Sequence, residues 1–475
     1  MNLLVSYNWL KKYVGLKETP EEFAAKVSLS GPGVERLYPQ GTLLDGIVVG
    51  HVLEVKTHPQ ADKLRLAIVD VGKKKLSIVC GGSNLVENQW VAVALIGAKV
   101  KWHGEGDLIE LKPVEIRGVK SEGMICAASE IGLGDAFPTE EREIFDLEKA
   151  QIGEKLKAGA PLASFLGIEG DVVLDTEVTT NRPDAMSIVG IAREAATILK
   201  RPFLWKEPKL PVGANLSVRP GPGTRHPGQT HGSARTKLSV TIQDKKLCPR
   251  FMGVRIDGVM VGESPWWLKR CLISAGIRPI NNLVDITNFI LLELGRPMHV
   301  FDADKIKGDL QVRFAKTGES IKALDEKIYK LGIKHLVIAD DQGAQSIAGI
   351  MGGEESGVTK QTKNIIFECA TWDPVQIRRT GRELNLQSDS QALFEKGLST
   401  ESTPIGLARA IELCQELAGG QIASNIVDTQ TGKYKPLSFS ISFEEIDTLI
   451  GVKISNKEML DTLKRLGFLL KVNSS

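Results

Sequence analysis

A stretch rich in proline, glycine, serine and histidine, at about Glu207–Thr236, interrupts the chain near its middle. Its core, RPGPGTRHPGQTHGSAR, carries too few apolar side chains to offset the entropy lost on ordering. We therefore expect a flexible linker at 206–237. The 475 residues are also too many for one hydrophobic core. Together these features predict three or four domains, placed on both sides of the linker.

The charge balance and the cysteine content exclude some kinds of function but do not identify one. Sixty basic and 58 acidic side chains leave a formal net charge of +2, so the whole chain has no electrostatic footprint for nucleic acid. The six cysteines are scattered without metal-ligand spacing, so we predict no metal site. Cys80 and Cys126 lie in apolar runs and are expected to be buried, reduced thiols. With no signal peptide and no 18-residue apolar run, we expect a cytoplasmic chain without a membrane partner.

Before the linker, helical and β-rich patterns alternate. Residues 1–39 predict an amphipathic helix, a turn and a second helix from Thr19-Pro20, and a further helix is expected over Ile188–Leu199. Between them stand four short β-rich runs, IVVGHVLEV, LRLAIVDVG, LSIVCGG and VAVALIG. Their close spacing, with turn residues between them, is typical of a small closed barrel.

Such a barrel exposes a strand face and loops suited to single-stranded or irregular nucleic acid. A solvated, charged barrel surface is the alternative, because 11 basic and 11 acidic residues balance between Asp45 and Glu130. Several side chains could reach phosphates, with one hydroxyl to add a hydrogen bond. They are His58, Lys63, Arg65, Lys99, Lys101, Arg117 and Lys120, and the hydroxyl of Ser121.

Three separated motifs favour the nucleic-acid interpretation: HPQADKL, GGSN and RGVKSEGM. With them, this stretch resembles the tRNA-binding barrel domain of several synthetases and structure-specific tRNA-binding proteins. The resemblance implies an OB-fold and a tRNA-binding role for six of the side chains above. These are His58, Lys63, Arg65, Arg117, Lys120 and Ser121.

After the linker, strand and helix patterns alternate in a long α+β region. The patterns predict strands at LSVTI, FMGVRIDGVMV, QVRFA, HLVIAD and NIIFECA, and helices at Pro265–Ala275 and Ser402–Ala418. Glu368 lies inside the apolar strand NIIFECA, so a buried partner or a ligand is expected for it. His299 follows an apolar helical run, where a hydrogen-bonded core histidine is commoner than a catalytic one. The glycines of AGIMGGEE permit close backbone approach to a ligand, or only a tight turn.

Several ordered motifs of this region extend the resemblance to nearly the whole chain. They are CPRFMGVRIDGV, SPWWLKRCLISAGIRPINNLVDITNFILLELGRPMHVFD, SIAGIMGGEESGV, FECATWDP and IRRTGRELNLQSDS, preceded by TEVTTNRPDAMSIVGIAREAA. In this order they resemble the front part of bacterial phenylalanyl-tRNA synthetase beta subunits. The resemblance implies a multidomain α+β fold. Its parts are an N-terminal α+β domain at 1–39 and 151–205, an OB-fold domain at 40–150, a B3/B4 editing domain at 238–432 and the helical start of a B5 domain at 433–475, which we expect to continue beyond Ser475.

The resemblance also implies an editing pocket that hydrolyses tyrosine wrongly attached to phenylalanine tRNA. His299, Glu368 and Thr287 take the catalytic positions. Substrate-binding positions fall on Asn288, Gly349, Gly352, Ser388 and Ser390. An apolar phenylalanine pocket rejects an added hydroxyl only about a hundredfold, whereas a buried carboxyl such as Glu368 can recognise the phenol. His299 and Thr287 would position the ester, the terminal ribose or the attacking water.

Two residues depart from the family pattern: Ser390 stands where alanine is usual, and Leu393 where arginine is usual. They leave open a second hypothesis, a non-catalytic tRNA-binding and assembly module with an inactive editing pocket. A third, a freestanding structural protein, predicts no tRNA binding at any salt concentration. The implied partners are tRNA(Phe) and an alpha subunit, in a heterotetramer of two alpha and two beta chains. We expect no cofactor on this part of the enzyme, and ATP and magnesium in the complete enzyme.

Overall fold

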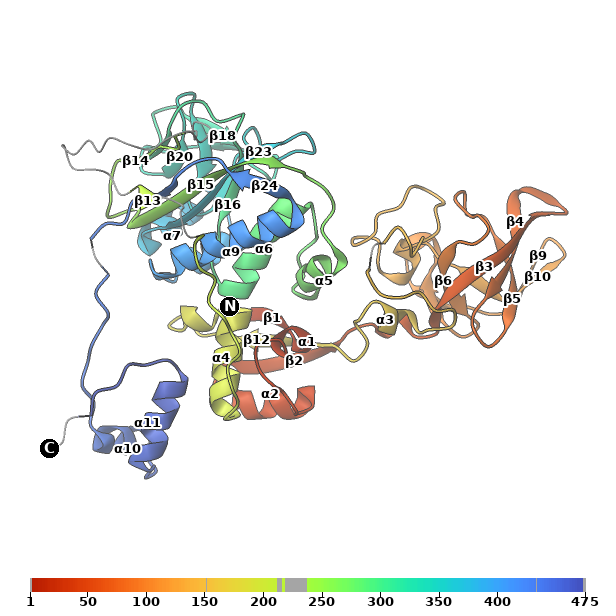
Figure 1. The fold of residues 1–475 in the computed structure, drawn as a ribbon, viewed down its shortest axis with the longest axis horizontal. Helices are drawn as coiled ribbons and strands as arrows, with labels where there is room; N and C mark the ends of the chain where they lie inside the picture. Colours follow the sequence, from red (N-terminus) through yellow and green to blue (C-terminus); the bar gives the residue numbers. More distant parts are fainter. Residues whose placement is uncertain (1, 151, 212–215, 218–236, 433, 473–475) are drawn as a thin grey trace, which may run out of the picture.

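The computed structural model describes residues 2–150, 152–211, 216–217, 237–432 and 434–472 (Figure 1). The core of the predicted linker, 212–215 and 218–236, lies outside the described residues. On either side of it the chain forms a small three-stranded sheet with helices, a barrel-like sheet, a larger two-sheet module and a C-terminal helix pair. The four predicted strand runs of the barrel are confirmed, as is the mixed α and β content.

The N-terminal sheet joins segments from both sides of the barrel. Its strands are β1 (Asn2–Ser6), β2 (Gly33–Pro39) and β12 (Val172–Glu177), in the antiparallel order β1-β12-β2. The amphipathic helix predicted for the first residues is wrong. Leu3 and Val5 are buried, Asn2 is exposed and Leu4 is half-buried, and the segment pairs with β12, so the chain forms a strand before the single-turn helix α1 (Tyr7–Leu10). The next two predicted helices are confirmed as α2 (Pro20–Ser28), begun by a capping box between Thr19 and Glu22, and α4 (Ile188–Ile198).

The barrel-like sheet is nearly closed. Its strand order is β11-β6-β3-β4-β5, and the ends approach where Glu122 N donates to Ser77 O (2.9 Å) and Val79 N donates to Ser121 Oγ (3.1 Å). Ser121 therefore serves barrel closure. The strands are β3 (Ile47–His58), β4 (Ala61–Asp70), β5 (Lys75–Cys80), β6 (Trp90–Leu95) and β11 (Gly123–Ile125), with hairpins β7 (Lys99–Lys101)–β8 (Leu108–Glu110) and β9 (Val114–Ile116)–β10 (Val119–Ser121).

The larger module stacks two sheets and a helix layer. Helices α6 (Asn282–Leu294) and α9 (Ser402–Leu417) pack on one face of a six-stranded sheet, and a five-stranded sheet covers its other face. In β23 (Asn364–Thr371), Phe367 and Cys369 face the helices, whereas Ile366 and Ala370 face the second sheet. This alternation follows from the two-residue repeat of a strand that is buried on both faces.

The remaining strands of the six-stranded sheet are β13 (Leu216–Ser217), β15 (Arg250–Val259), β16 (His299–Asp302), β24 (Gly419–Ile422) and β25 (Ile426–Asp428). The five-stranded sheet has β14 (Val240–Ile242), β17 (Leu310–Phe314), β20 (Leu336–Ala339), β21 (Ala344–Ile347) and β22 (Met351–Gly352), and a hairpin joins β18 (Ser320–Lys322) and β19 (Ile328–Lys330). Three more helices complete the module: α5 (Trp266–Ser274), α7 (Pro374–Glu383) and α8 (Asp389–Phe394).

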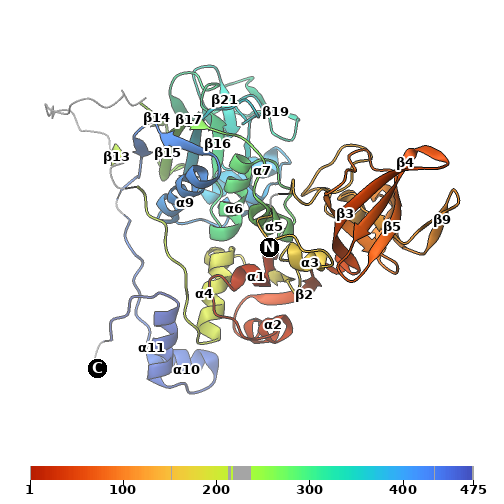
Figure 2. The same ribbon diagram turned by 45° about the vertical axis from the view of Figure 1, so that its right-hand side comes forward.

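Helix α5 links this module to the barrel side of the molecule, next to the short α3 (Leu162–Phe165) in both views (Figures 1 and 2). Trp266 Nε1 donates to Leu166 O at 2.7 Å, and Lys269 Nζ donates to Ala136 O at 2.8 Å. Phe137 also packs on Trp266, with 5.1 Å between the ring centroids. Because the two polar bonds end on main-chain carbonyls, they fix the position of α5 whatever side chains those loops carry.

Two helices end the described chain, as predicted for this segment: α10 (Phe443–Ile450) and α11 (Asn456–Arg465). Ser442 and Glu445 form a capping box at the start of α10, and Gly451 ends it in the left-handed conformation. Short 3-10 turns occur at Thr42–Leu44, Trp102–Gly104, Ser129–Ile131 and Pro183–Ala185. Within the ranges described, no helix combines the length and the apolar character that crossing a membrane requires.

Replacing Ser121 with alanine should loosen the closure of the barrel. The change leaves the buried Val79 N–H without an acceptor, which costs about 1–3 kcal/mol. Hydrogen exchange of the peptide 75–82 should therefore accelerate roughly five- to a hundredfold, with exchange in the two-sheet module unchanged. Ser83→Ala, at an exposed barrel serine, is the matched control. Equal protection in both variants would show that Ser121 does not hold the closure.

Candidate functional site

The antiparallel pairing of β16 with β23 sets His299 directly opposite Glu368. Their side chains consequently share one face of the sheet, the face covered by the five-stranded sheet. On the other side of β23, Glu368 is opposite Gly253 of β15, which has no side chain to fill the space. Glu368 is buried, yet no hydrogen bond or ion pair within the described part of the chain engages its carboxyl. The site thus contains a buried acid that lacks a protein partner.

Burial shifts both groups toward their neutral forms. Desolvation raises the pKa of Glu368 to about 8, and the nearby charge of Arg296 opposes this rise. Desolvation lowers the pKa of His299 to about 4, so its imidazole is neutral at pH 7. The Nε2 atom of His299 is buried and has no partner among the described residues. A ligand that enters here meets one buried carboxyl and one buried imidazole nitrogen, both free to bond.

The glycine loop before and within β22 packs against His299. A Cβ atom on Gly352 would lie 2.2 Å from Cε1 of His299, so any side chain there would displace the imidazole. Gly349 has a φ of +68°, and a Cβ there would lie 2.6 Å from the Trp372 ring. Both glycines are therefore required by close contacts, and not only by a turn.

Ser388 connects the same loop to α8. Its hydroxyl donates to Ile350 O at 2.7 Å and accepts a hydrogen bond from Gln391 N, which caps the helix. One continuous set of contacts therefore joins five of the predicted pocket residues. These are His299, Glu368, Gly349, Gly352 and Ser388.

The other predicted pocket residues are not joined to His299 and Glu368 by these contacts. The Thr287 hydroxyl donates to Val284 O within α6 (2.7 Å), and neither it nor half-buried Asn288 has a hydrogen bond to His299 or Glu368 in the part of the chain that is described. Ser390 is half-buried on α8, two residues beyond the capping serine. Leu393, on the same helix, is buried in the core formed with α6 and α9.

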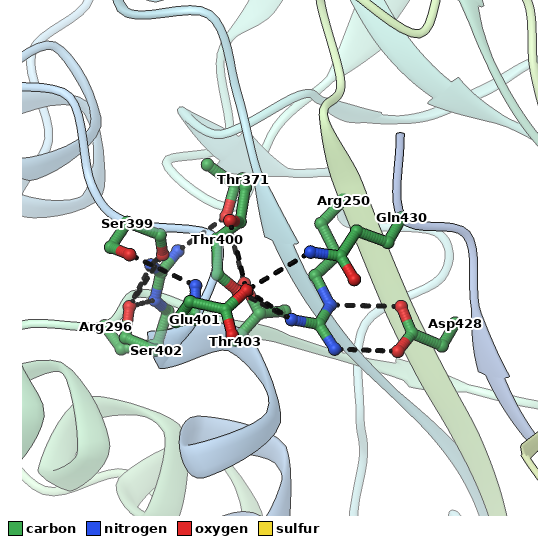
Figure 3. A network of polar contacts seen from close by, with 10 residues as sticks. All are labelled: Arg250, Arg296, Thr371, Ser399, Thr400, Glu401, Ser402, Thr403, Asp428 and Gln430. Carbon is green, nitrogen blue, oxygen red and sulfur yellow. Dashed lines mark hydrogen bonds and ion pairs between the residues drawn. The ribbon is translucent and has the colours of Figure 1, made fainter. Parts of the chain in front are cut away.

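Sequence reasoning missed Arg296, in the turn between α6 and β16. Its side chain is fully buried, and its Nη1 donates to Ala370 O (3.0 Å) and Thr371 Oγ1 (3.3 Å). Figure 3 shows it beside a second buried arginine, Arg250, which forms a bidentate ion pair with Asp428. One signal for Arg296 was present in the sequence: a charged residue between an apolar helix and an apolar strand.

The barrel exposes some of its predicted RNA-contacting residues and buries others. Lys63, Arg65 and Lys120 are exposed, and exposed Arg117 donates from Nη1 to Gln60 O at 3.2 Å. Lys99 is also exposed, whereas Lys101 is half-buried.

His58 and Ser121, also predicted to contact RNA, do not face solvent. His58 is buried, with Nε2 3.2 Å from Ile116 O and Nδ1 accepting from Gln60 N. It holds the β3–β4 turn against the β9–β10 hairpin. Ser121 bonds Val79 N and Gly123 O inside the barrel.

A cavity of about 380 Å³ lies elsewhere, between the barrel, the N-terminal part and α5. Its wall includes Leu43, Ile273 and Arg270, and Nη1 of Arg270 already donates to Gly167 O. None of the predicted editing residues lines it. We assign the candidate site to the surroundings of His299 and Glu368, because the unpartnered Nε2 atom of His299 and the buried carboxyl of Glu368 lie on paired strands there. No group of three or more potential metal ligands occurs in the described ranges.

Two family models match parts of the chain. Residues 47–155 match a putative tRNA binding domain, and residues 247–419 match a B3/4 domain. The first covers the barrel, and the second covers the two-sheet module that holds His299 and Glu368.

Curated relatives match nearly the entire chain. A phenylalanine–tRNA ligase beta subunit of Fusobacterium nucleatum is 38% identical over 99% of this chain and 55% of its own length. The beta subunit of Synechococcus elongatus is 37% identical over 96% of this chain and 54% of its own length. A solved N-terminal fragment of the phenylalanyl-tRNA synthetase beta subunit from Pyrococcus horikoshii is 17% identical, over 64% of this chain and 79% of its own length, with a TM-score of 0.30. That score is too low to support an argument.

The sequence matches to the beta subunits cover 99% and 96% of this chain, a span that includes the regions of both domain models. The chain therefore belongs to the phenylalanine–tRNA ligase beta-subunit family, and it spans about half the length of the curated relatives it matches.

Proposed function

We propose that this chain binds tRNA(Phe) and hydrolyses mischarged tyrosyl-tRNA(Phe) at the site of His299 and Glu368. The observation that carries the proposal is the pair of buried polar groups, set opposite each other, that lack protein partners. In the proposed assembly, two such chains join two alpha subunits, and the alpha subunit attaches phenylalanine with ATP and magnesium.

Glu368 is the group that distinguishes tyrosine from phenylalanine in this proposal. A phenol hydroxyl donates a charge-assisted hydrogen bond to an ionised carboxyl, whereas phenylalanine offers no donor and leaves the buried acid unmatched. With a pKa of about 8, roughly one tenth of the Glu368 side chains are ionised at pH 7. Binding of the tyrosyl group is therefore linked to loss of a proton from Glu368.

His299 serves the hydrolytic step. Water attacks the ester carbonyl carbon, the bond from that carbon to the ribose oxygen breaks, and the proton lost by water is returned to the ribose oxygen. The neutral imidazole of His299 offers an acceptor nitrogen at Nε2 if the tautomer leaves it unprotonated. Thr287 would orient the ester or the terminal ribose after releasing its bond to Val284 O. Hydroxyls of the RNA can share the proton transfer, so His299 acts in positioning, in base catalysis or in both.

The barrel contributes an accessory contact to the RNA backbone. Lys63, Arg65 and Lys120 are exposed and carry positive charge, while the barrel as a whole is balanced in charge. Electrostatic attraction is therefore local to a few phosphates and weakens as salt rises.

A second candidate is a non-catalytic tRNA-binding and assembly module. Ser390 and Leu393 favour it, because Ser390 adds a polar group on the helix that Ser388 caps, and Leu393 is buried without charge. Both candidates predict tRNA binding. Only the first predicts hydrolysis that depends on the pocket.

Replacing the pocket residues should impair proofreading while leaving the fold intact. We expect His299→Ala to slow deacylation of tyrosyl-tRNA(Phe) about a hundredfold, since it removes a group that positions or activates water. Glu368→Ala should remove the preference for tyrosyl over phenylalanyl esters. His335→Ala and Glu319→Gln, at a buried and a half-buried residue of the same module that bond Glu383 and Arg313, are matched controls. Background hydrolysis by wild type and all variants alike would favour the non-catalytic module.

The preference for tyrosyl over phenylalanyl esters should rise with pH. Because desolvation raises the pKa of Glu368 to about 8, its ionised fraction grows about tenfold per pH unit below 8 and levels off above it. The ratio of kcat/KM for the two esters should follow that curve between pH 6 and 9, since hydroxide-dependent chemistry cancels in the ratio. Glu368→Gln should give a low ratio that does not change with pH. A flat wild-type ratio would contradict recognition by the ionised form.

Removing exposed barrel charges should weaken RNA binding and its salt dependence together. For Lys63→Ala combined with Arg65→Ala, each lost phosphate contact should reduce the slope of log K against log salt by about 0.7 to 0.9. A filter-binding or anisotropy titration of tRNA(Phe) at several salt concentrations measures this. Lys73→Ala with Lys74→Ala removes the same charge from the exposed β4–β5 turn and serves as the control. Identical slopes in both double variants would place the RNA elsewhere.

A further inference from the structure

We propose that Arg296 is a positioning residue of the candidate editing site, holding its segments together and supplying the positive charge under which Glu368 ionises. This inference rests on the proposed function and adds a residue to it.

The contacts of the Arg296 guanidinium join the segments of His299 and Glu368 to the chain that follows α8, the helix of Ser390. Arg296 itself stands in the turn between α6 and β16, three residues before His299. It donates to Ala370 O and Thr371 Oγ1 at the end of β23, the strand of Glu368. It also donates to Ser399 O, in the loop that follows α8, and to Ser402 Oγ, at the start of α9 (Figure 3).

The packing around Arg296 is built for a large side chain. A Cβ atom on Gly406 of α9 would lie 2.8 Å from Cγ of Arg296, so the glycine gives the arginine stem its space. The guanidinium also lies over the Phe394 ring, 5.9 Å from its centroid. A shorter side chain would leave a cavity beside α9 and beside α8, the helix that carries Ser390.

Arg296 differs from its neighbour in how its charge is balanced. Arg250 is neutralised by Asp428 in a bidentate pair and also contacts Glu401 (Figure 3). The acceptors of Arg296 are carbonyl and hydroxyl oxygens, and no ion pair to it occurs in the described residues. Its positive charge therefore remains uncompensated in a region of low dielectric, where Coulomb interactions are strong.

Few charged or titratable groups act on Glu368 from its surroundings. His299 faces it from β16 and is neutral at pH 7. The buried thiol of Cys248 approaches from before β15, and that of Cys369 follows Glu368 in β23; burial raises the pKa of both thiols. Arg296 is the charged group that lowers the pKa of Glu368 against desolvation. Loss of the Arg296 charge should consequently move the ionisation of Glu368 to higher pH.

The test measures the tyrosyl-to-phenylalanyl ratio of kcat/KM from pH 6 to 10 with the 475-residue chain. In the wild type this ratio rises with pH, and the midpoint is the pH at which it reaches half its maximum. Arg296→Met should raise the midpoint by about one pH unit, which lowers the ratio about tenfold at pH 7. Arg296→Lys keeps the positive charge but loses the planar guanidinium with its several N–H donors. The midpoint should therefore stay at its wild-type value while kcat falls. A purely structural role would lower the rate at every pH without moving the midpoint.

Arg250→Met is the matched control, since it removes a buried arginine whose charge is already paired. We expect it to reduce stability without moving the midpoint. Equal shifts in Arg250→Met and Arg296→Met, or no shift in either, would overturn the inference. An inactive wild-type chain would instead refute the proposed function, so the two failures are distinguishable.

If Arg296→Met does not fold, as judged by circular dichroism, Ser402→Ala decides the positioning role. It removes one hydroxyl acceptor of the guanidinium at the start of α9 and leaves the charge in place. We expect kcat for tyrosyl-tRNA(Phe) to fall several-fold with an unmoved midpoint. Thr400→Ala, in the same loop, removes a hydroxyl that bonds Glu401 and not Arg296. An unchanged kcat in Ser402→Ala, or the same fall in both variants, would contradict positioning through Arg296.

Discussion

The register between β16 and β23 is the constraint on which the candidate site depends. It sets His299 opposite Glu368, and a slip of β16 by one residue would turn His299 to the helix layer, away from Glu368. The register is secured by apolar neighbours with opposite preferences. Val300 and Phe367 belong to the core beside α6 and α9, whereas Phe301 and Ile366 belong to the core between the sheets. Burial of these four residues therefore stabilises the one pairing that keeps the acid and the imidazole together.

The same strands explain why two polar groups remain buried without partners. Each is surrounded by positions where a side chain is absent or apolar: Gly253 beside Glu368, and Gly352 and Phe301 against His299. Polar neighbours would have satisfied these groups and reduced the cost of burying them. The free energy lost by burying these two polar groups is offset by the packing of the surrounding apolar core. Buried groups that await a partner are typical of a binding site, where a ligand completes the hydrogen bonds.

Much of the fold could be predicted from residue patterns, and much of the chemistry could not. Thr19 and Glu22 mark a helix start in the sequence because a capping box is a local interaction. The first strand was missed because Leu3 and Val5 form it only by pairing with β12, about 170 residues away. Burial of Glu368 was foreseeable from its apolar strand. The burial of His58 depends on a distant hairpin, and the importance of Arg296 depends on three segments that meet only in the fold. Contacts between segments that are distant in the sequence leave no local sequence pattern.

A barrel of balanced charge can still assist a distant pocket if the two are held at a fixed separation. Helix α5 provides such a connection, because Trp266 and Lys269 bond main-chain carbonyls at Leu166 and Ala136. Tyr13 adds a second connection, from the N-terminal part to Glu293 in α6, which Arg409 of α9 also binds. When one contact is made, a rigid connection raises the effective concentration for the next. Under the proposed function, a few weak phosphate contacts on the barrel then suffice, since the site of His299 and Glu368 is the part that distinguishes one aminoacyl ester from another.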